Sequence, residues 1–221
     1  MRMKCRRTLK IIGLTLAAAM LAGGCGATSS SAGGGESESD TAGEWVSVGD
    51  TAAIVWGKGD RGVVLSHGAA YDAASWESQG QTLGENGAVA LAVEDTSPGS
   101  LLFAIEYLKK EYGVGGVSLI GASAGAGPVL QVAEEYPEEM NQIILLSGTG
   151  DVSGLGEYPK LFVASEGEEI ADEVRRMADQ APGDQNEALI LSGDAHAQAI
   201  FQTEEGERLM RVILERLEEY G

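Results

Sequence analysis

The chain has 221 residues, of which 43% are hydrophobic, and carries 34 acidic against 15 basic residues for a formal net charge of −19 at pH 7. This length and apolar content suffice for one domain with a substantial core. The acidic excess repels polyanions, so the composition argues against nucleic acid as a partner.

The first 24 residues have the order of an export signal. Five basic residues fall within the first ten, an apolar run follows at 11–21, and small residues precede Cys25. The apolar run is shorter than the ~20 residues that a membrane-spanning helix needs. We therefore predict that residues 1–24 are a signal peptide and that the protein is exported.

The stretch LAGGC at 21–25 resembles the lipobox of bacterial lipoproteins. The resemblance implies that Cys25 is diacylated on sulfur, becomes the new N-terminus and anchors a cell-surface or periplasmic lipoprotein to the membrane. One position departs from the pattern, because Leu21 lies four residues before the cysteine and Ala22 occupies the usual aliphatic site. Cleavage by an ordinary signal peptidase and a buried thiol at Cys25 are the alternatives.

Residues 25–43 hold Cys25 and then a run of Gly, Ser, Ala and acidic residues without apolar periodicity. Such a run buries too little surface to fold, so we predict a flexible tether that leads to a domain at 44–221. Loss of residues 1–24 removes five basic and no acidic residues, which leaves 10 basic against 34 acidic and a net charge of −24. An anionic membrane surface repels that charge, so attachment would depend on the covalent lipid.

From Glu44 onward, short apolar runs alternate with segments of helical spacing. The runs are rich in Val, Ile and Leu and predict buried strands at 61–67, 87–94, 116–121, 142–148, 160–166 and 187–193. Helical spacing follows Pro98, capped by Thr96 or Ser97, and recurs at 124–136, 170–180 and 207–220. This alternation predicts an α/β fold with a mostly parallel, doubly wound sheet, helices on both faces and an added hairpin at 45–57.

Ser123 stands where the strand at 116–121 turns into the helix at 124–136. Its neighbours form Gly121-Ala122-Ser123-Ala124-Gly125, which matches the G-x-S-x-G nucleophile elbow. Small flanking residues are needed there because the turn strains the serine backbone and brings strand and helix close together. We therefore predict that Ser123 is a catalytic nucleophile, against the alternative of a glycine-rich corner with an incidental serine.

A serine nucleophile needs a base, and the chain holds two histidines. His67 ends the first parallel strand in a His-Gly pair, which is well explained as a rigid corner satisfied by local hydrogen bonds. His196 follows the last strand and precedes the terminal helix, so its loop can lean across the sheet toward Ser123. We predict that His196 is the base.

Three motifs along residues 60–220 resemble the α/β-hydrolase family, in the order that the family uses. HGAAYDAASW at 67–76 is similar to the oxyanion loop, GASAG at 121–125 to the elbow, and SGDAHA at 192–197 to the histidine loop. Within the family, this sequence is most similar to the small, capless members akin to dienelactone hydrolases and short esterases. One departure is Ala197, where many relatives have glycine.

The resemblance also implies the remaining site residues. The triad acid should follow the strand at 160–166, where counting three residues past Ser165 gives Glu168, and the alternatives are Glu166, Glu169, Asp172 and Asp151. The oxyanion hole would use the backbone N–H groups of Ala69 and Ala124. Tyr71, on the oxyanion loop, is a candidate pocket residue, whereas Trp76 is expected to pack the start of a helix.

These residues predict a serine hydrolase that cleaves carboxylic esters through an acyl-enzyme and needs no metal or organic cofactor. The connection at 148–159 is too short for a cap. We therefore expect a shallow pocket and a small-molecule ester with a short acyl chain, or an exposed ester on a larger molecule. Two alternatives stay open: a thioesterase or acyltransferase with the same triad, and a catalytically silent surface lipoprotein that binds a ligand on the hydrolase scaffold.

Overall fold

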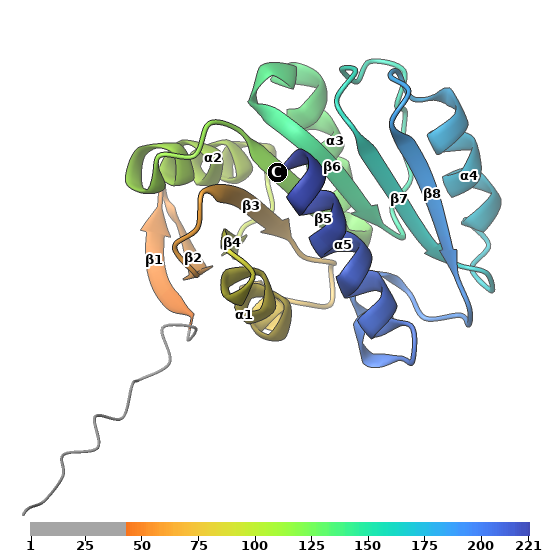
Figure 1. Cartoon of the computed structure of the whole chain (residues 1–221), viewed down its shortest axis with the longest axis horizontal. Helices are drawn as coiled ribbons and strands as arrows, with labels where there is room; N and C mark the ends of the chain where they lie inside the picture. Colours follow the sequence, from red (N-terminus) through yellow and green to blue (C-terminus); the bar gives the residue numbers. More distant parts are fainter. Residues whose placement is uncertain (1–42) are drawn as a thin grey trace, which may run out of the picture. The chain divides into compact units, whose positions relative to one another are not determined.

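The computed structural model describes residues 43–221, so the predicted signal peptide, Cys25 and the tether up to residue 42 lie outside the described residues. Within 43–221, one sheet of eight strands has the order β1-β2-β4-β3-β5-β6-β7-β8 (Figure 1). The strands are β1 (Glu44–Val48), β2 (Thr51–Trp56), β3 (Arg61–Ser66), β4 (Ala88–Val93), β5 (Val117–Ala122), β6 (Met140–Leu146), β7 (Lys160–Ser165) and β8 (Asn186–Leu191).

The pairing of the strands makes the sheet mostly parallel. β1 and β2 form a hairpin whose turn passes through Gly49 at φ 57°, a left-handed value that glycine adopts without strain. β2 pairs antiparallel with β4, and the neighbouring pairs from β4 to β8 are all parallel. The predicted parallel sheet and the predicted hairpin are both confirmed.

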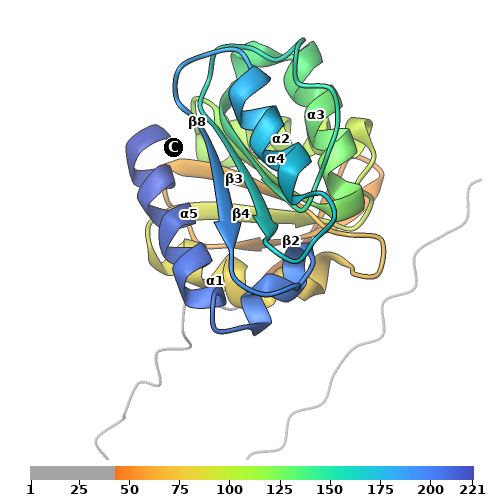
Figure 2. The ribbon, with the colours of Figure 1, turned by 90° about the vertical axis from the view of Figure 1, so that its right-hand side faces the viewer.

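Helices cover both faces of the sheet, as Figure 2 shows from the side. The α-helices of the described chain are α1 (Glu77–Glu85), α2 (Pro98–Tyr112), α3 (Ala126–Glu135), α4 (Ala171–Gln180) and α5 (Gly206–Tyr220). The start of α2 has the predicted form, because Pro98 lies in its first turn and the Ser97 side chain accepts the N–H of Ser100. Gly113 ends this helix in a left-handed cap at φ 74°.

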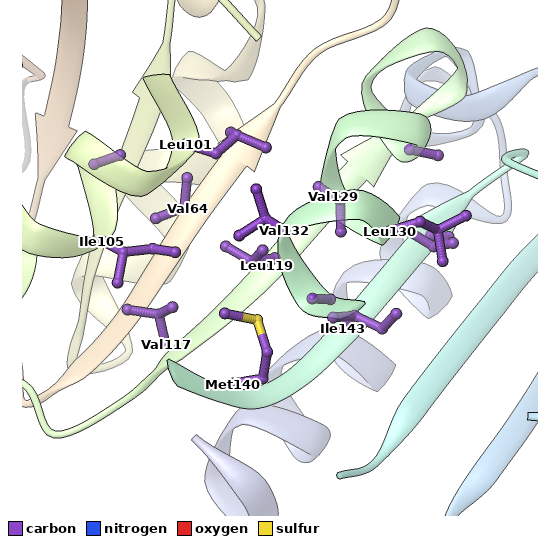
Figure 3. Packing of buried hydrophobic residues seen from close by; sticks show 14 of the residues in the cluster. Val64, Leu101, Ile105, Val117, Leu119, Val129, Leu130, Val132, Met140 and Ile143 are labelled. Atoms are coloured by element: carbon purple, nitrogen blue, oxygen red, sulfur yellow. The ribbon is translucent and has the colours of Figure 1, made fainter. Parts of the chain in front are cut away.

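The two faces of the sheet bury separate apolar clusters. On one face, Val64, Leu119 and Ile143 lie among residues of α2 and α3 (Figure 3), in a cluster that also includes residues of α4. On the other face, Leu65 and Ile120 belong to a cluster that includes residues of α1 and α5. Strands buried on both sides read as continuous apolar runs, which is why these strands are visible in the sequence.

The connection from β6 to β7, residues 147–159, contains no helix or strand. The described chain therefore has no cap domain, as predicted, and no inserted domain lies over the carboxyl edge of the sheet. Among residues 43–221, none of the helices combines the length and apolar character that crossing a bilayer requires.

Candidate active site

The predicted site residues follow strands that lie near one another in the sheet. Ser123 follows β5, and the predicted oxyanion loop follows β3, whose Ser66 pairs in register with Gly121 of β5. Glu168 follows β7, and His196 follows the adjacent edge strand β8. Parallel strands end at the same edge of a sheet, so these loops meet at the carboxyl edge.

Ser123 has a left-handed backbone conformation with φ 50°, which is strained for a residue other than glycine. The flanking glycines have no room for a side chain. A β-carbon on Gly121 would lie 2.9 Å from the Ala126 Cα, and one on Gly125 would lie 2.6 Å from the backbone oxygen of Ser66. The glycines of the motif are therefore required by the close approach of α3 and the neighbouring strand.

Three side chains from three loops form one hydrogen-bonded chain. His196 Nε2 lies 2.8 Å from Ser123 Oγ, and His196 Nδ1 lies 2.6 Å from Glu168 Oε1. An ionised carboxylate only accepts, so Nδ1 carries the ring proton and Nε2 is left to accept from the serine hydroxyl. The His196 side chain is 55% exposed, whereas that of Glu168 is 7% exposed. The imidazole therefore faces solvent while its carboxylate partner is buried.

The other candidate acids have partners elsewhere or are exposed. Asp172 pairs with Arg175 on α4. Asp151 accepts the N–H of Ser153 at 2.9 Å, and this hydrogen bond holds the pKa of the Asp151 carboxyl below its usual range. The remaining two candidates are exposed side chains beside Glu168, namely Glu166 and Glu169. Among the described residues, Glu168 is the carboxylate that contacts the imidazole.

Glu168 is held by two donors on its other carboxylate oxygen. The Ser165 N–H donates to Oε2 at 2.7 Å, and the Ser147 hydroxyl donates to it at 2.8 Å. The Ser147 oxygen in turn accepts the N–H of Ala197 at 2.8 Å. One serine hydroxyl therefore joins the acid to the histidine loop, and no local motif marks Ser147 in the sequence.

Backbone strain gathers around this network. Among the described residues, the non-glycine residues with positive φ are Ser123 at 50°, Ser147 at 48° and Ala197 at 51°. All three contribute to, or directly support, the hydrogen-bonded chain. Such strained conformations persist only where the surrounding structure holds them, and they cluster at functional sites.

Gln198 joins the histidine loop to the predicted oxyanion loop. Its buried side chain accepts the N–H of Gly68 at 2.9 Å and donates to the Ser75 hydroxyl at 2.8 Å. Ala69 follows Gly68 directly, and both Ala69 and Ala124 are exposed. Within 43–221, the Ala69 N–H has no acceptor. That N–H is therefore available to a bound molecule.

His67 and Trp76 are engaged within the fold. His67 Nδ1 lies 2.9 Å from the carbonyl oxygen of Gly68, and its Nε2 lies 3.1 Å from that of Glu94. Trp76 is buried just before α1, and its ring meets Phe201 edge-on with the ring centroids 6.1 Å apart. His67 therefore has the local partners expected of a rigid corner, and Trp76 packs the start of α1.

A cavity of about 210 Å³ lies between the predicted oxyanion loop, the start of α1 and the 3-10 turn Ala197–Gln202 that follows His196. Tyr71 is part of its wall. A larger cavity of about 630 Å³ includes Arg61 and Ala88, at the amino ends of β3 and β4, and therefore lies at the opposite edge of the sheet from Ser123.

Two further observations concern possible metal ligands and sequence relatives. No group of three or more His, Cys, Asp or Glu side chains in the described part of the chain could hold a metal ion. No family model and no curated protein matches the sequence.

Solved structures identify the fold. A CIB-like hydrolase from Thermoplasma acidophilum has a TM-score of 0.59 and 19% identity, with 79% of this chain and 96% of that chain covered. A monoacylglycerol lipase from Paleococcus ferrophilus has a TM-score of 0.62 and 16% identity, with 77% and 99% covered. A dienelactone hydrolase from Anabaena variabilis has a TM-score of 0.62 and 17% identity, with 80% and 96% covered. The chain therefore has an α/β-hydrolase fold, and its activity has to be argued from the site.

Proposed function

We propose that the protein is a serine hydrolase that cleaves carboxylic esters, with Ser123 as nucleophile, His196 as base and Glu168 as acid. The observation that carries the proposal is the continuous chain of hydrogen bonds at 2.8 Å and 2.6 Å through the two ring nitrogens of His196. A nucleophile bonded to a base that is oriented by a third group is the arrangement that activates a weak serine hydroxyl.

The first half of the reaction forms an acyl-enzyme. Ser123 Oγ attacks the ester carbonyl carbon as His196 Nε2 takes its proton, and Glu168 offsets the charge of the resulting imidazolium. The backbone N–H groups of Ala69 and Ala124 would bind the oxyanion, each contributing about 3 kcal/mol of transition-state stabilisation. His196 then protonates the leaving alcohol. In the second half, the same imidazole activates water to release the acid.

Hydrolysis is favoured over acyl transfer by the exposure of the base. The His196 side chain is 55% exposed, so water can reach the imidazole that would activate it for attack on the acyl-enzyme. An acyltransferase has to keep water from its acyl-enzyme, and no cap lies between β6 and β7 to do so. The same open edge fits a short acyl chain, and the net negative charge disfavours anionic esters.

A serine-reactive fluorophosphonate probe tests the proposal. We expect the probe to label the wild-type protein and to label Ser153→Ala equally, because Ser153 is exposed on a different loop. Ser123→Ala should lose both the label and the hydrolysis of p-nitrophenyl acetate. Folded wild-type protein that neither reacts with the probe nor cleaves short esters would instead be a silent scaffold.

We also propose that the protein is exported and anchored to the membrane through a lipid on Cys25, on the basis of the sequence of residues 1–25. Metabolic labelling with an alkynyl fatty acid in a bacterial host tests this. Cys25→Ala should abolish the label, whereas Cys5→Ala, within the predicted signal, should keep it. A shortened, unlabelled wild-type protein in the medium or periplasm would favour ordinary signal peptidase.

A further inference from the structure

The cavity of about 210 Å³ lies between the predicted oxyanion loop and the turn that follows His196. His196 Nε2 faces Ser123 Oγ and would deliver the proton to the leaving oxygen, so the alcohol half of an ester lies on the His196 side of the nucleophile. The turn Ala197–Gln202, which begins directly after His196, forms one wall of the cavity. The cavity therefore borders the loop that carries the base, which is the group that would protonate the leaving alcohol.

Gly68 connects the cavity to the nucleophile. A β-carbon built on Gly68 would lie 3.4 Å from the Ser123 Cβ and 3.6 Å from Cδ2 of Tyr71. Tyr71 is itself part of the cavity wall. Gly68 therefore lies within van der Waals distance of both the nucleophile and an aromatic ring of the cavity wall.

The wall of the cavity is polar without being charged. Its side chains are three glutamines, two serines and two aromatic rings, although the sequence holds 34 acidic residues. A charged ligand would find no counter-ion in this wall, and an anion would also face the negative field of the protein. A purely apolar group would gain little from amides and hydroxyls.

Part of this polarity is unused within the protein. The Gln198 amide oxygen accepts the N–H of Gly68, and its NH₂ group donates to the Ser75 hydroxyl. The side chains of Gln79 and Gln202, by contrast, have no hydrogen-bond partner among residues 43–221. Each primary amide offers two donors and one acceptor oxygen, which is the complement of neighbouring hydroxyl groups that both donate and accept.

We propose that this cavity binds the alcohol half of the substrate and selects an uncharged group with several hydroxyls, the size of one sugar ring or a glycerol unit. The volume is below the roughly 300–1,000 Å³ of sites for drug-sized ligands, so the cavity takes one small unit. The aromatic rings of Tyr71 and Phe201 would contact its C–H surface while the glutamine amides bind its hydroxyls. This inference rests on the proposed ester hydrolysis and deepens it.

The test compares acetate esters that differ in the alcohol alone. Glycerol monoacetate and 6-O-acetylglucose carry the hydroxyls, and butyl acetate and cyclohexylmethyl acetate match them in size without hydroxyls. We expect kcat/KM for at least one hydroxylated ester to exceed that for its matched ester about tenfold, the effect of one or two neutral hydrogen bonds. Preference for the sugar or for the glycerol ester then distinguishes a ring from an open chain.

The double variant Gln79→Leu with Gln202→Leu connects the preference to the cavity. It should lower the ratio of kcat/KM for the hydroxylated ester to kcat/KM for its matched ester about tenfold. Gln180→Leu, an exposed glutamine at the end of α4, is the matched control and should leave the ratio unchanged. Equal rates for hydroxylated and matched esters, or a preference that survives the double variant, would overturn the inference.

Hydrolysis of p-nitrophenyl acetate separates the two possible failures. An active enzyme without hydroxyl preference contradicts only the assignment of the cavity. A folded protein that hydrolyses none of these esters contradicts the proposed function itself.

Discussion

Replacing Glu168 by glutamine separates the charge of the proposed acid from its shape. The Oε2 atom of Glu168 accepts two donors, the N–H of Ser165 and the hydroxyl of Ser147. A backbone N–H cannot reverse its role, so the glutamine oxygen must take the Oε2 position and its NH₂ group must face His196. His196 Nδ1 then has to accept, which moves the ring proton to Nε2 and toward Ser123.

The serine hydroxyl of this variant no longer faces a base. The equivalent change in a serine protease lowers kcat about 10⁴-fold, or about 5.5 kcal/mol of transition-state stabilisation. Here the imidazole is 55% exposed and can turn into solvent more readily than a buried one. We therefore expect kcat/KM for p-nitrophenyl acetate to fall between about 10³-fold and 10⁴-fold.

The matched control for this prediction is Glu168→Asp, which keeps the charge and should retain more activity than the glutamine variant. The rate of fluorophosphonate labelling should fall in parallel with kcat/KM, and a thermal melt should show that both variants are folded. A folded Glu168→Gln variant with more than a tenth of the wild-type kcat/KM would refute the assignment of Glu168 as the acid.

Three further changes probe the site and the core. Gln198→Leu removes the acceptor of the Gly68 N–H, so kcat for p-nitrophenyl acetate should fall about tenfold with a smaller change in KM, and an unchanged kcat would contradict a positioning role. Gly125→Ala places a β-carbon 2.6 Å from the Ser66 backbone oxygen. It should lower the free energy of unfolding in urea by about 1–3 kcal/mol. An unchanged unfolding midpoint would contradict the tight contact between Gly125 and Ser66. Burial lowers the pKa of Lys160 to about 8, below its ordinary 10.5. Between pH 8 and 10.5 Lys160 holds its proton in the unfolded chain and not in the folded protein. The free energy of unfolding of the wild type should therefore rise with pH relative to that of Lys160→Met. Parallel plots of the two free energies against pH would contradict the lowered pKa.

The strands and the elbow can be predicted because their causes are local. Each buried parallel strand is a continuous apolar run, and the elbow requires glycine on both sides of Ser123. The helix α1 is harder to recognise, since Gly80 and Leu83 are the residues that it buries. Its sequence therefore has little apolar spacing to mark it.

The supports of the site cannot be read from the sequence in the same way. Ser147 and Gln198 act through contacts across 50 and 130 positions, and such contacts depend on where the loops end in space. A serine or a glutamine in a loop is ordinary in composition. The family spacing points to Glu168, three residues past Ser165, but four other acids stay open, and the distance from Glu168 to His196 is what separates them.

The position of β8 at the end of the sheet has a consequence for how the protein loses function. The strand has a neighbour on one side only, and it leads to the loop that carries His196, while Ser123 follows the central strand β5. Local unfolding of β8 would move the imidazole away from the hydroxyl while Trp56, on β2 near the other end of the sheet, remains buried. Inactivation by urea should therefore precede the change in tryptophan fluorescence.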